Sequence, residues 1–331
     1  MNPQPSIAIL EKQGGVLSWH EDLADGFRSQ GAKVTTIQLR PTTFAEYQTK
    51  WRTHASSLTN QAIVSRISNE LAKLQPDLVI VLKQAGLPLS TLDAWRSALR
   101  TDVPLIGWLC DHLTRWPEEN DPCLNGVYYF DSASRPILQN AYANHTTRLQ
   151  HLPLAASPLR YASANIPFYQ RKRRLVFAGK NTRSRKQQIA AYRKAGGDID
   201  TFGPLADTGL LLWRRRNLSP TCLARLYSSY YAVLNLLQSP NTLNGLNLRA
   251  FEIPAAGGLA TYPLVPDLAE AFIPGEEVLA YRDLGDLKDQ INELLKHPAR
   301  ASEIATAGRA RFLREHTFAH RARRFLEDWL G

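Results

Sequence analysis

The sequence predicts an α/β protein built from two doubly wound parallel sheets, and three observations support this fold class. Short apolar runs rich in β-branched residues alternate with longer segments of helical periodicity, which is typical of parallel βαβ units. The length of 331 residues suits two domains at about 100 to 200 residues each. A stretch containing Pro and Ser at residues 152–167 separates two such series. We therefore expect one sheet on each side of it.

The first half is predicted to form six strands. They are residues 7–10, 34–39, 78–82, 105–109, 127–130 and 149–152. Helical patterns fill most gaps between them: Leu23 and Phe27 share a face before Gly31, and residues 63–74 repeat apolar side chains at three- and four-residue steps before Pro76.

The second half is predicted to form five strands, at residues 175–178, 199–202, 232–236, 259–261 and 278–281. Helices are expected at 184–195 and 247–256, and the chain from Leu287 onward reads as helices only. Ligands of doubly wound sheets bind at the carboxyl ends of the strands, so we expect the functional site at a cleft between the two domains.

Composition excludes several classes of protein. Hydrophobic residues make up 44% and charged residues 21%, which argues against a disordered or collagen-like chain. The three cysteines form no CxxC, so disulfides and structural zinc are not expected. No run approaches the roughly 20 apolar residues of a membrane-spanning helix, and the start lacks the pattern of a signal peptide. We expect a cytoplasmic protein.

The net charge of +10 lies entirely in the second half of the chain. Residues 1–150 contain 14 Lys and Arg against 14 Asp and Glu, whereas residues 151–226 alone contain 15 against 3. This asymmetry predicts an anionic ligand near the second domain, with nucleic acid and anionic lipid open as partners. Arg214–Arg216 and the basic final helix would permit peripheral contact with the inner face of a membrane.

The stretch 241–258 is the most informative motif. It follows a predicted strand and enters a helix, so the backbone N–H groups at the helix start are suited to phosphate. Gly245 permits close backbone approach, Arg249 one turn into the helix adds a bidentate contact, and Glu252 can accept bonds from a ribose diol. This combination suits a nucleotide diphosphate.

Several ordered blocks resemble the C-terminal domain of the CgeB-like group 1 glycosyltransferases. The blocks are residues 247–258, 271–278, 281–283, 294–298 and 316–321. The resemblance implies the GT-B fold: a Rossmann-like acceptor domain at 1–155, a Rossmann-like sugar-nucleotide domain at 156–315, and a helix at 316–331 that packs back toward the first domain. It also implies that Glu252 contacts the donor ribose and that Arg249 lies near the diphosphate, with Asn247 in the same donor loop. The first half is similar more loosely, through residues 77–81 and 106–111.

One position departs from the pattern of related GT-B enzymes. Their Glu-x7-Glu motif places an acid eight residues before the ribose-binding glutamate, and here that position is Asn244. The missing carboxylate argues against a retaining mechanism of that type and favours inversion.

Basic residues follow the first strand of the second half. The stretch 177–185 reads as a strand, a glycine turn and a basic helix start. In GT-B proteins the equivalent turn approaches the donor phosphates, so Lys180, Arg183 and Arg185 are candidates to neutralise the leaving diphosphate.

Candidate catalytic bases lie in the first half. Gly14 and Gly15 form a loop that would face the donor sugar and the acceptor in a GT-B frame, and His20 follows it. Asp111 and His112 end the strand at 105–109, and Asp111 is the preferred base among the three. Two further acids at strand ends are held in reserve, Glu11 and Asp131.

No metal site is predicted. Asp198 and Asp200 resemble a DxD motif but straddle the start of a strand, away from the edge where ligands bind. His316 and His320 are four residues apart without a matching acid, which favours a structural role. Basic side chains and a helix start can replace a cation at the diphosphate, so no cofactor is expected.

These patterns predict a metal-independent glycosyltransferase that moves a sugar from a nucleotide-diphosphate sugar to an acceptor nucleophile. Protein, glycan, lipid and small-molecule acceptors all stay open, and no nucleic acid is expected. The alternative from another class is a catalytically degenerate GT-B scaffold that binds nucleic acid or an anionic membrane surface. A different nucleotide-dependent enzyme, such as a sugar-nucleotide epimerase, is a third hypothesis.

Overall fold

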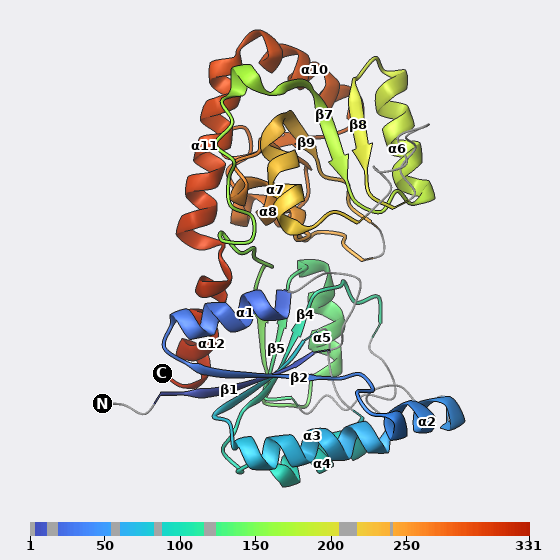
Figure 1. Ribbon diagram of the computed structural model, residues 1–331, viewed down its shortest axis with the longest axis vertical. Helices are drawn as coiled ribbons and strands as arrows, with labels where there is room; N and C mark the ends of the chain where they lie inside the picture. The colour runs from blue at the N-terminus through green and yellow to red at the C-terminus, as the bar shows by residue number, and fades with distance from the viewer. Residues whose placement is uncertain are drawn as a thin grey trace. The chain divides into compact units, whose positions relative to one another are not determined.

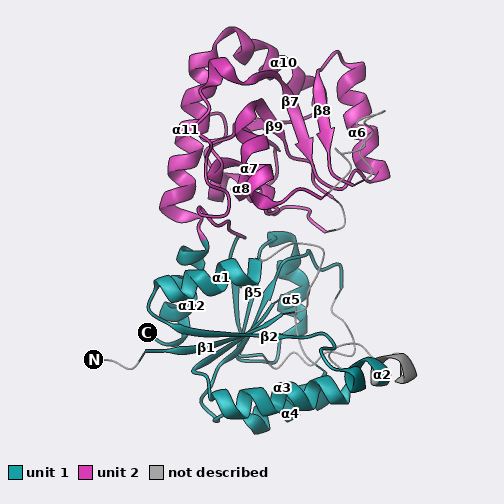
Figure 2. Cartoon of the chain, in the orientation of Figure 1, with its two compact units in different colours: residues 1–153, 318–331 teal, residues 154–317 magenta. Residues whose placement is uncertain are grey.

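The computed structural model describes residues 4–11, 19–53, 60–82, 88–115, 124–204, 217–238 and 241–331 (Figure 1). The chain divides into two compact units (Figure 2). Unit 1 comprises Met1–Pro153 together with Phe318–Gly331, and unit 2 comprises Leu154–Thr317. The last stretch of the chain therefore belongs to the unit in which the chain begins.

Unit 1 is organised around a parallel sheet, which in the described residues has six strands in the order β2-β1-β3-β4-β5-β6. The strands are β1 (Ser6–Glu11), β2 (Lys33–Gln38), β3 (Leu78–Leu82), β4 (Leu105–Leu109), β5 (Gly126–Tyr129) and β6 (Arg148–His151). The helical elements are α1 (Trp19–Ser29), α2 (Phe44–Thr53), α3 (Gln61–Leu74), α4 (Leu89–Ala98), η1 (Ser132–Ser134), α5 (Arg135–Ala141) and α12 (Phe318–Trp329).

Helices cover both faces of this sheet (Figure 1). Val79 and Val81 face the core formed with α3 and α4, where Ile67 and Trp95 are fully buried. On the other face, Trp108 packs against aromatic rings of α1 and α12. Side chains of both faces are buried because the helices of a parallel sheet lie on both sides of it, which explains the continuous apolar runs in the sequence.

The C-terminal helix α12 completes the core of unit 1. The Phe325 ring centroid lies 4.7 Å from that of Tyr128, 5.4 Å from that of Trp108 and 6.1 Å from that of Phe27. Gly26 of α1 allows this close packing, since a Cβ at that position would lie 2.6 Å from the carbonyl oxygen of Phe318. Helix α12 is therefore part of the unit's core and not a tail.

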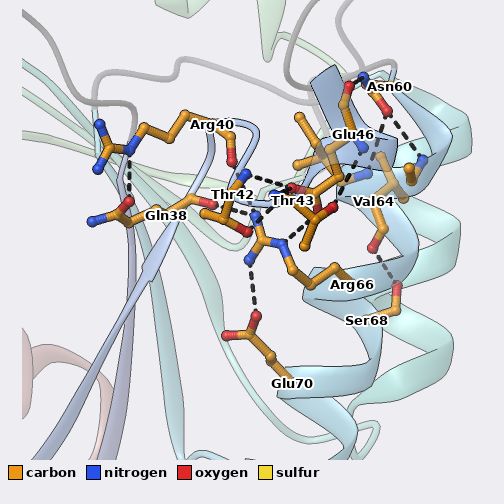
Figure 3. Close-up of polar contacts among 12 residues, drawn as sticks. Gln38, Arg40, Thr42, Thr43, Glu46, Asn60, Val64, Arg66, Ser68 and Glu70 are labelled. Carbon is orange, nitrogen blue, oxygen red and sulfur yellow. Dashed lines mark hydrogen bonds and ion pairs between the residues drawn. The ribbon is translucent and has the colours of Figure 1, made fainter. Parts of the chain in front are cut away.

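A polar cluster fixes the connection that follows β2 (Figure 3). The Arg66 guanidinium contacts Glu46 at 2.7 Å and donates to the carbonyl oxygen of Gln38 at 2.7 Å. The backbone N–H of Thr42 donates to the same Glu46 carboxylate at 2.6 Å. Burial alone would raise the pKa of Glu46, but the bonds from Thr42 and Arg66 outweigh it and lower the pKa.

Unit 2 contains a second parallel sheet, which in the described residues has five strands in the order β11-β10-β9-β7-β8. The strands are β7 (Lys172–Ala178), β8 (Ile199–Phe202), β9 (Tyr230–Leu234), β10 (Ala260–Pro263) and β11 (Leu279–Tyr281). The helical elements are η2 (Phe168–Gln170), α6 (Arg183–Lys194), α7 (Pro220–Ser229), α8 (Arg249–Ala255), α9 (Leu268–Ala271), α10 (Leu284–Lys296) and α11 (Pro298–Glu315).

The two sheets share one connectivity. In each, the second strand pairs on one side of the first, and the third strand pairs on the other side. Strand order therefore reverses between β1 and β3 in unit 1 and between β7 and β9 in unit 2. Loops leave such a switch point in opposite directions, which opens a ligand site at the carboxyl ends of these two strands.

The predicted fold class, α/β with two doubly wound parallel sheets, is confirmed. Each predicted strand overlaps a strand of the structure, and the largest difference at a strand start is β7, which begins at Lys172 and not at residue 175. Among the described residues, no helix is both long enough and apolar enough to cross a bilayer.

Truncation of Phe325 to alanine is expected to destabilise unit 1 by about 3 to 5 kcal/mol, because it removes a fully buried ring from between α1, β4 and β5. Urea denaturation monitored by fluorescence would measure this change. Leu330→Ala is the matched control, since Leu330 is 38% exposed and its loss should cost less than about 0.5 kcal/mol. Equal losses in the two variants would show that α12 does not belong to the core.

Candidate functional site

The switch point of unit 2 gathers most of the predicted donor-binding residues. After β7 the chain turns at Gly179 and enters α6 at Arg183, and after β9 it continues through Asn235 toward α8. Because β7 and β9 are neighbours in the sheet, their two loops lie side by side. The structure thus brings together two motifs that are about 70 residues apart in the sequence.

Residue 179 must be a glycine because the Arg249 side chain lies against the loop after β7. Its φ is 155°, and a Cβ there would lie 2.6 Å from Nη2 of Arg249. A side chain at this position would therefore displace the guanidinium. The glycine thus lets a cation of α8 rest directly on the β7–α6 turn.

Arg185 connects the two loops. Its guanidinium donates to the carbonyl oxygen of Lys180 and to that of Leu236, each at 3.2 Å. The side chain is buried, and its Nε has no partner within the described structure. Burial, with a smaller contribution from the charge of Arg249, lowers the pKa of Arg185 to about 10. Arg185 thus carries a buried positive charge whose bonded partners are neutral carbonyls.

Arg249 brings a second cation to the same place. The guanidinium carbons of Arg249 and Arg185 lie 5.5 Å and 5.6 Å from the centroid of the Phe177 ring. Nη1 of Arg249 also reaches Oδ1 of Asn235 at 3.5 Å. In the structure Arg249 is the first residue of α8, which corrects the predicted position one turn into a helix at 247–256; the loop runs two residues further before the helix begins.

Lys180 and Arg183 extend this positive region to the surface. Both are exposed, one in the turn after β7 and the other at the start of α6. No carboxylate of the described chain forms an ion pair with Lys180, Arg183, Arg185 or Arg249. An open hollow of about 420 Å³ adjoins the turn, lined by Asn181, Arg183, Lys186, Gln187 and Ala190. The region is suited to an anion.

Amide and phenol groups hold the loop before α8 in place. Asn235 and Asn247 exchange two side-chain hydrogen bonds of 2.9 Å and 3.0 Å. The Tyr262 hydroxyl accepts from the backbone N–H of Asn247 at 3.0 Å and donates to the carbonyl oxygen of Gly245 at 3.2 Å. Asn247 and Gly245 therefore shape the loop from which Arg249 projects.

Glu252 lies one turn after Arg249, on the same side of α8. The hydroxyl of Tyr161 donates to its Oε1 at 2.7 Å. This bond fixes the Glu252 carboxylate near the cationic region.

Asn244 lies in the loop before α8 and is half-buried. Its backbone oxygen accepts a hydrogen bond from the N–H of Asp267 at 3.2 Å.

The switch point of unit 1 carries a paired histidine and glutamate. Glu11 is the last residue of β1, and His20 is the second residue of α1. Nδ1 of His20 lies 2.6 Å from Oε2 of Glu11, whose side chain is only 3% exposed. The Glu11 carboxylate therefore lies beside Nδ1 of the ring and not beside Nε2. Gly14 and Gly15 lie outside the described residues.

The other candidate bases differ in their surroundings. Asp111 follows β4 and is exposed. Nδ1 of His112 contacts the Ser134 hydroxyl at 3.1 Å. Asp131 is fully buried and accepts from the backbone N–H of Ala133 at 3.0 Å, where it caps η1. Asp131 thus has a structural task.

The residues considered as metal ligands are engaged elsewhere. Arg174 forms ion pairs with both Asp198 and Asp200, and Tyr230 donates to Asp200 at 2.6 Å. His316 ends α11 and precedes α12, and its Nε2 contacts the carbonyl oxygen of Ala271 at 2.8 Å. Within the described ranges no group of three or more His, Cys, Asp or Glu side chains is arranged to hold a metal ion. Arg214–Arg216 lie outside those ranges.

Three residues of the unit 2 site were not singled out from the sequence. Asn235 follows β9 directly, so its place at the carboxyl end of a strand was a usable signal. Phe177 was identified only as part of a strand. Tyr161 lies 91 positions before its partner Glu252, and no local pattern marks it.

The family comparison agrees with this geometry. Residues 173–327 match a family model described as glycosyl transferase-like. The matched stretch covers most of unit 2 and includes Arg185, Arg249 and Glu252. The resemblance to the CgeB-like glycosyltransferases is confirmed over this stretch. No curated protein matches the chain.

Solved glycosyltransferases share the whole fold. A glycosyltransferase from Rickettsia africae superimposes with a TM-score of 0.69 at 11% identity, covering 99% of this chain and 98% of its own. Anabaena HepE in complex with UDP and glucose gives 0.63 at 12%, covering 98% and 99%. An alpha-glucosyltransferase in complex with UDP and DNA gives 0.69 at 12%, covering 98% of both chains. The predicted GT-B fold is confirmed.

Pyrophosphate is expected to raise the melting temperature of the protein, because it would neutralise cations at the β7–β9 switch point that no carboxylate of the described residues pairs with. A ligand that binds only the folded state stabilises it by about 2.7 kcal/mol at a hundred times its Kd. Differential scanning fluorimetry would measure the shift, which Arg249→Ala should largely abolish.

The control for this test is Arg282→Ala, which removes an exposed arginine of unit 2 that is already paired with Asp286. It should leave the pyrophosphate shift intact. If both variants lose the shift equally, general surface charge and not a site explains the binding.

Proposed function

We propose that the protein transfers a sugar from a UDP-sugar to an acceptor nucleophile. The observation that carries this proposal is a pair of arginines, Arg185 and Arg249, that no carboxylate of the described residues pairs with. They lie near Glu252 at the switch point of unit 2, within the stretch that matches the glycosyl transferase-like model. UDP is the proposed carrier because HepE and the alpha-glucosyltransferase of the same fold bind it.

In this proposal the donor is held by four basic residues and one acid. Arg249, Lys180 and Arg183 contact the diphosphate, and Arg185 holds their two loops together while adding its buried charge. Glu252 accepts hydrogen bonds from the ribose hydroxyls. The loop around Asn244, Gly245 and Asn247 frames the sugar and phosphates. The positive charge stabilises UDP as a leaving group, so no divalent cation is needed.

We assign the base to His20, because it has an orienting partner. Oε2 of Glu11 lies beside Nδ1 of His20, and in this proposal Nε2 on the other side of the ring takes the proton from the acceptor hydroxyl. The acceptor oxygen forms its bond to the anomeric carbon as the bond from that carbon to the β-phosphate oxygen breaks, and UDP leaves with the electron pair. A single displacement inverts the anomeric centre, which agrees with an asparagine at residue 244. Asp111, exposed at the end of β4, is the competing base.

The test is UDP release from UDP-glucose with water as acceptor, in the presence of EDTA. His20→Ala should lower the rate about 100- to 10,000-fold with little change in UDP affinity, and Glu11→Gln should lower it less. His112→Ala is the matched control and should stay near wild type. NMR of the glucose as it is released should show the β anomer.

Other outcomes would overturn parts of the proposal. If Asp111→Asn and not His20→Ala abolished turnover, the base would be reassigned. Release of α-glucose would contradict inversion, and dependence on added magnesium would contradict the cation-free diphosphate site. The degenerate scaffold would be supported if the wild-type protein bound no sugar nucleotide but bound nucleic acid with an affinity that rises steeply as the salt concentration falls.

A further inference from the structure

Tyr161 holds the Glu252 carboxylate from a part of the chain outside the donor motifs. Its hydroxyl donates to Oε1 of Glu252 at 2.7 Å, and its side chain is 7% exposed. A hydrogen bond from a buried neutral donor to a carboxylate is charge-assisted and directional. It therefore fixes the orientation of the Glu252 carboxylate and not merely its position along the helix.

A second tyrosine lies near the same carboxylate. Burial and, to a smaller extent, the negative charge of Glu252 raise the pKa of Tyr227. The carboxylate of Glu252 therefore lies near tyrosines of both α7 and the segment before β7.

The segment that carries Tyr161 is itself anchored to the end of α8. Arg171 donates to the carbonyl oxygen of Gly257 and to that of Ile166, each at 3.0 Å. Its guanidinium carbon lies 3.8 Å from the centroid of the Phe168 ring. Gly257 has a φ of 73°, and a Cβ there would lie 2.8 Å from the hydroxyl of Ser163. The position of the Tyr161 hydroxyl is thus set by the fold before any ligand arrives.

We propose that Tyr161 is a positioning residue that determines how strongly the site selects ribose. This inference rests on the proposed function, in which Glu252 accepts from the ribose hydroxyls. Glutamate has several rotatable bonds, so a carboxylate without the tyrosine bond would lose more freedom when it engages the sugar. The Tyr161 hydrogen bond fixes the carboxylate before the ligand binds. It therefore strengthens the binding only of a nucleotide whose ribose hydroxyls can donate to Glu252.

The experiment compares UDP with 2′,3′-dideoxy-UDP by isothermal titration calorimetry on the full chain. Wild type should prefer UDP. Tyr161→Phe keeps the buried ring and removes only the hydroxyl, so it should weaken UDP binding about 10-fold while leaving dideoxy-UDP binding unchanged. In a Glu252→Ala background the same substitution should have no further effect.

Tyr231→Phe is the matched control. It removes the hydroxyl of another buried tyrosine of unit 2, which bonds to the carbonyl oxygen of Leu294 and not to Glu252. The control should keep the wild-type preference for UDP, and melting temperatures of both variants would show that they are folded.

Two results would overturn the proposal. An unchanged preference in Tyr161→Phe, or an equal loss of affinity for both nucleotides, would show that Tyr161 has only a structural role while the proposed donor site stands. A wild-type protein that binds neither nucleotide would overturn the proposed function itself, and the assignment of Tyr161 with it.

Discussion

Two guanidinium groups, those of Arg185 and Arg249, lie within 6 Å of the Phe177 ring without a carboxylate of the described chain to pair with them. Burying a charge is costly unless it is paired and hydrogen-bonded. Carbonyl oxygens in the two loops satisfy Arg185 in part, and an anionic ligand would relieve the cost that remains. Gly179 leaves room for the Arg249 guanidinium, and the hydrogen-bonded pair of Asn235 and Asn247 holds the loop from which Arg249 projects.

The fold explains why the site forms where it does. Both sheets have the same connectivity, and both switch points carry chemically active side chains. In unit 2 the starts of α6 and α8 carry the two arginines, whereas in unit 1 the end of β1 and the start of α1 carry Glu11 and His20. In the proposed function the cationic residues of unit 2 bind the donor, and the histidine of unit 1 acts on the acceptor.

Much of this could be predicted from the sequence, because apolar runs and glycine turns are local signals. The strands of the described residues followed from periodicity, and the placement of Arg249 and Glu252 on one face of a helix followed from their spacing. The contribution of Tyr161 could not be predicted, because a long-range hydrogen bond leaves no mark on either partner's neighbours. The sequence also could not show that Arg183 and Arg185 differ in burial. Arg185 is buried and donates to two carbonyl oxygens, whereas Arg183 is exposed, and their spacing does not distinguish them. Glu11 was a reserve residue until the fold placed it beside His20.

The most direct test of the account is a crystal structure of the protein with UDP. We expect the diphosphate within hydrogen-bonding distance of the Arg249 guanidinium, at the turn formed by Gly179 and Lys180. The ribose hydroxyls should donate to the Glu252 carboxylate, with the hydrogen bond from Tyr161 intact. A nucleotide bound away from the β7–β9 switch point, or a ribose that does not contact Glu252, would contradict this account.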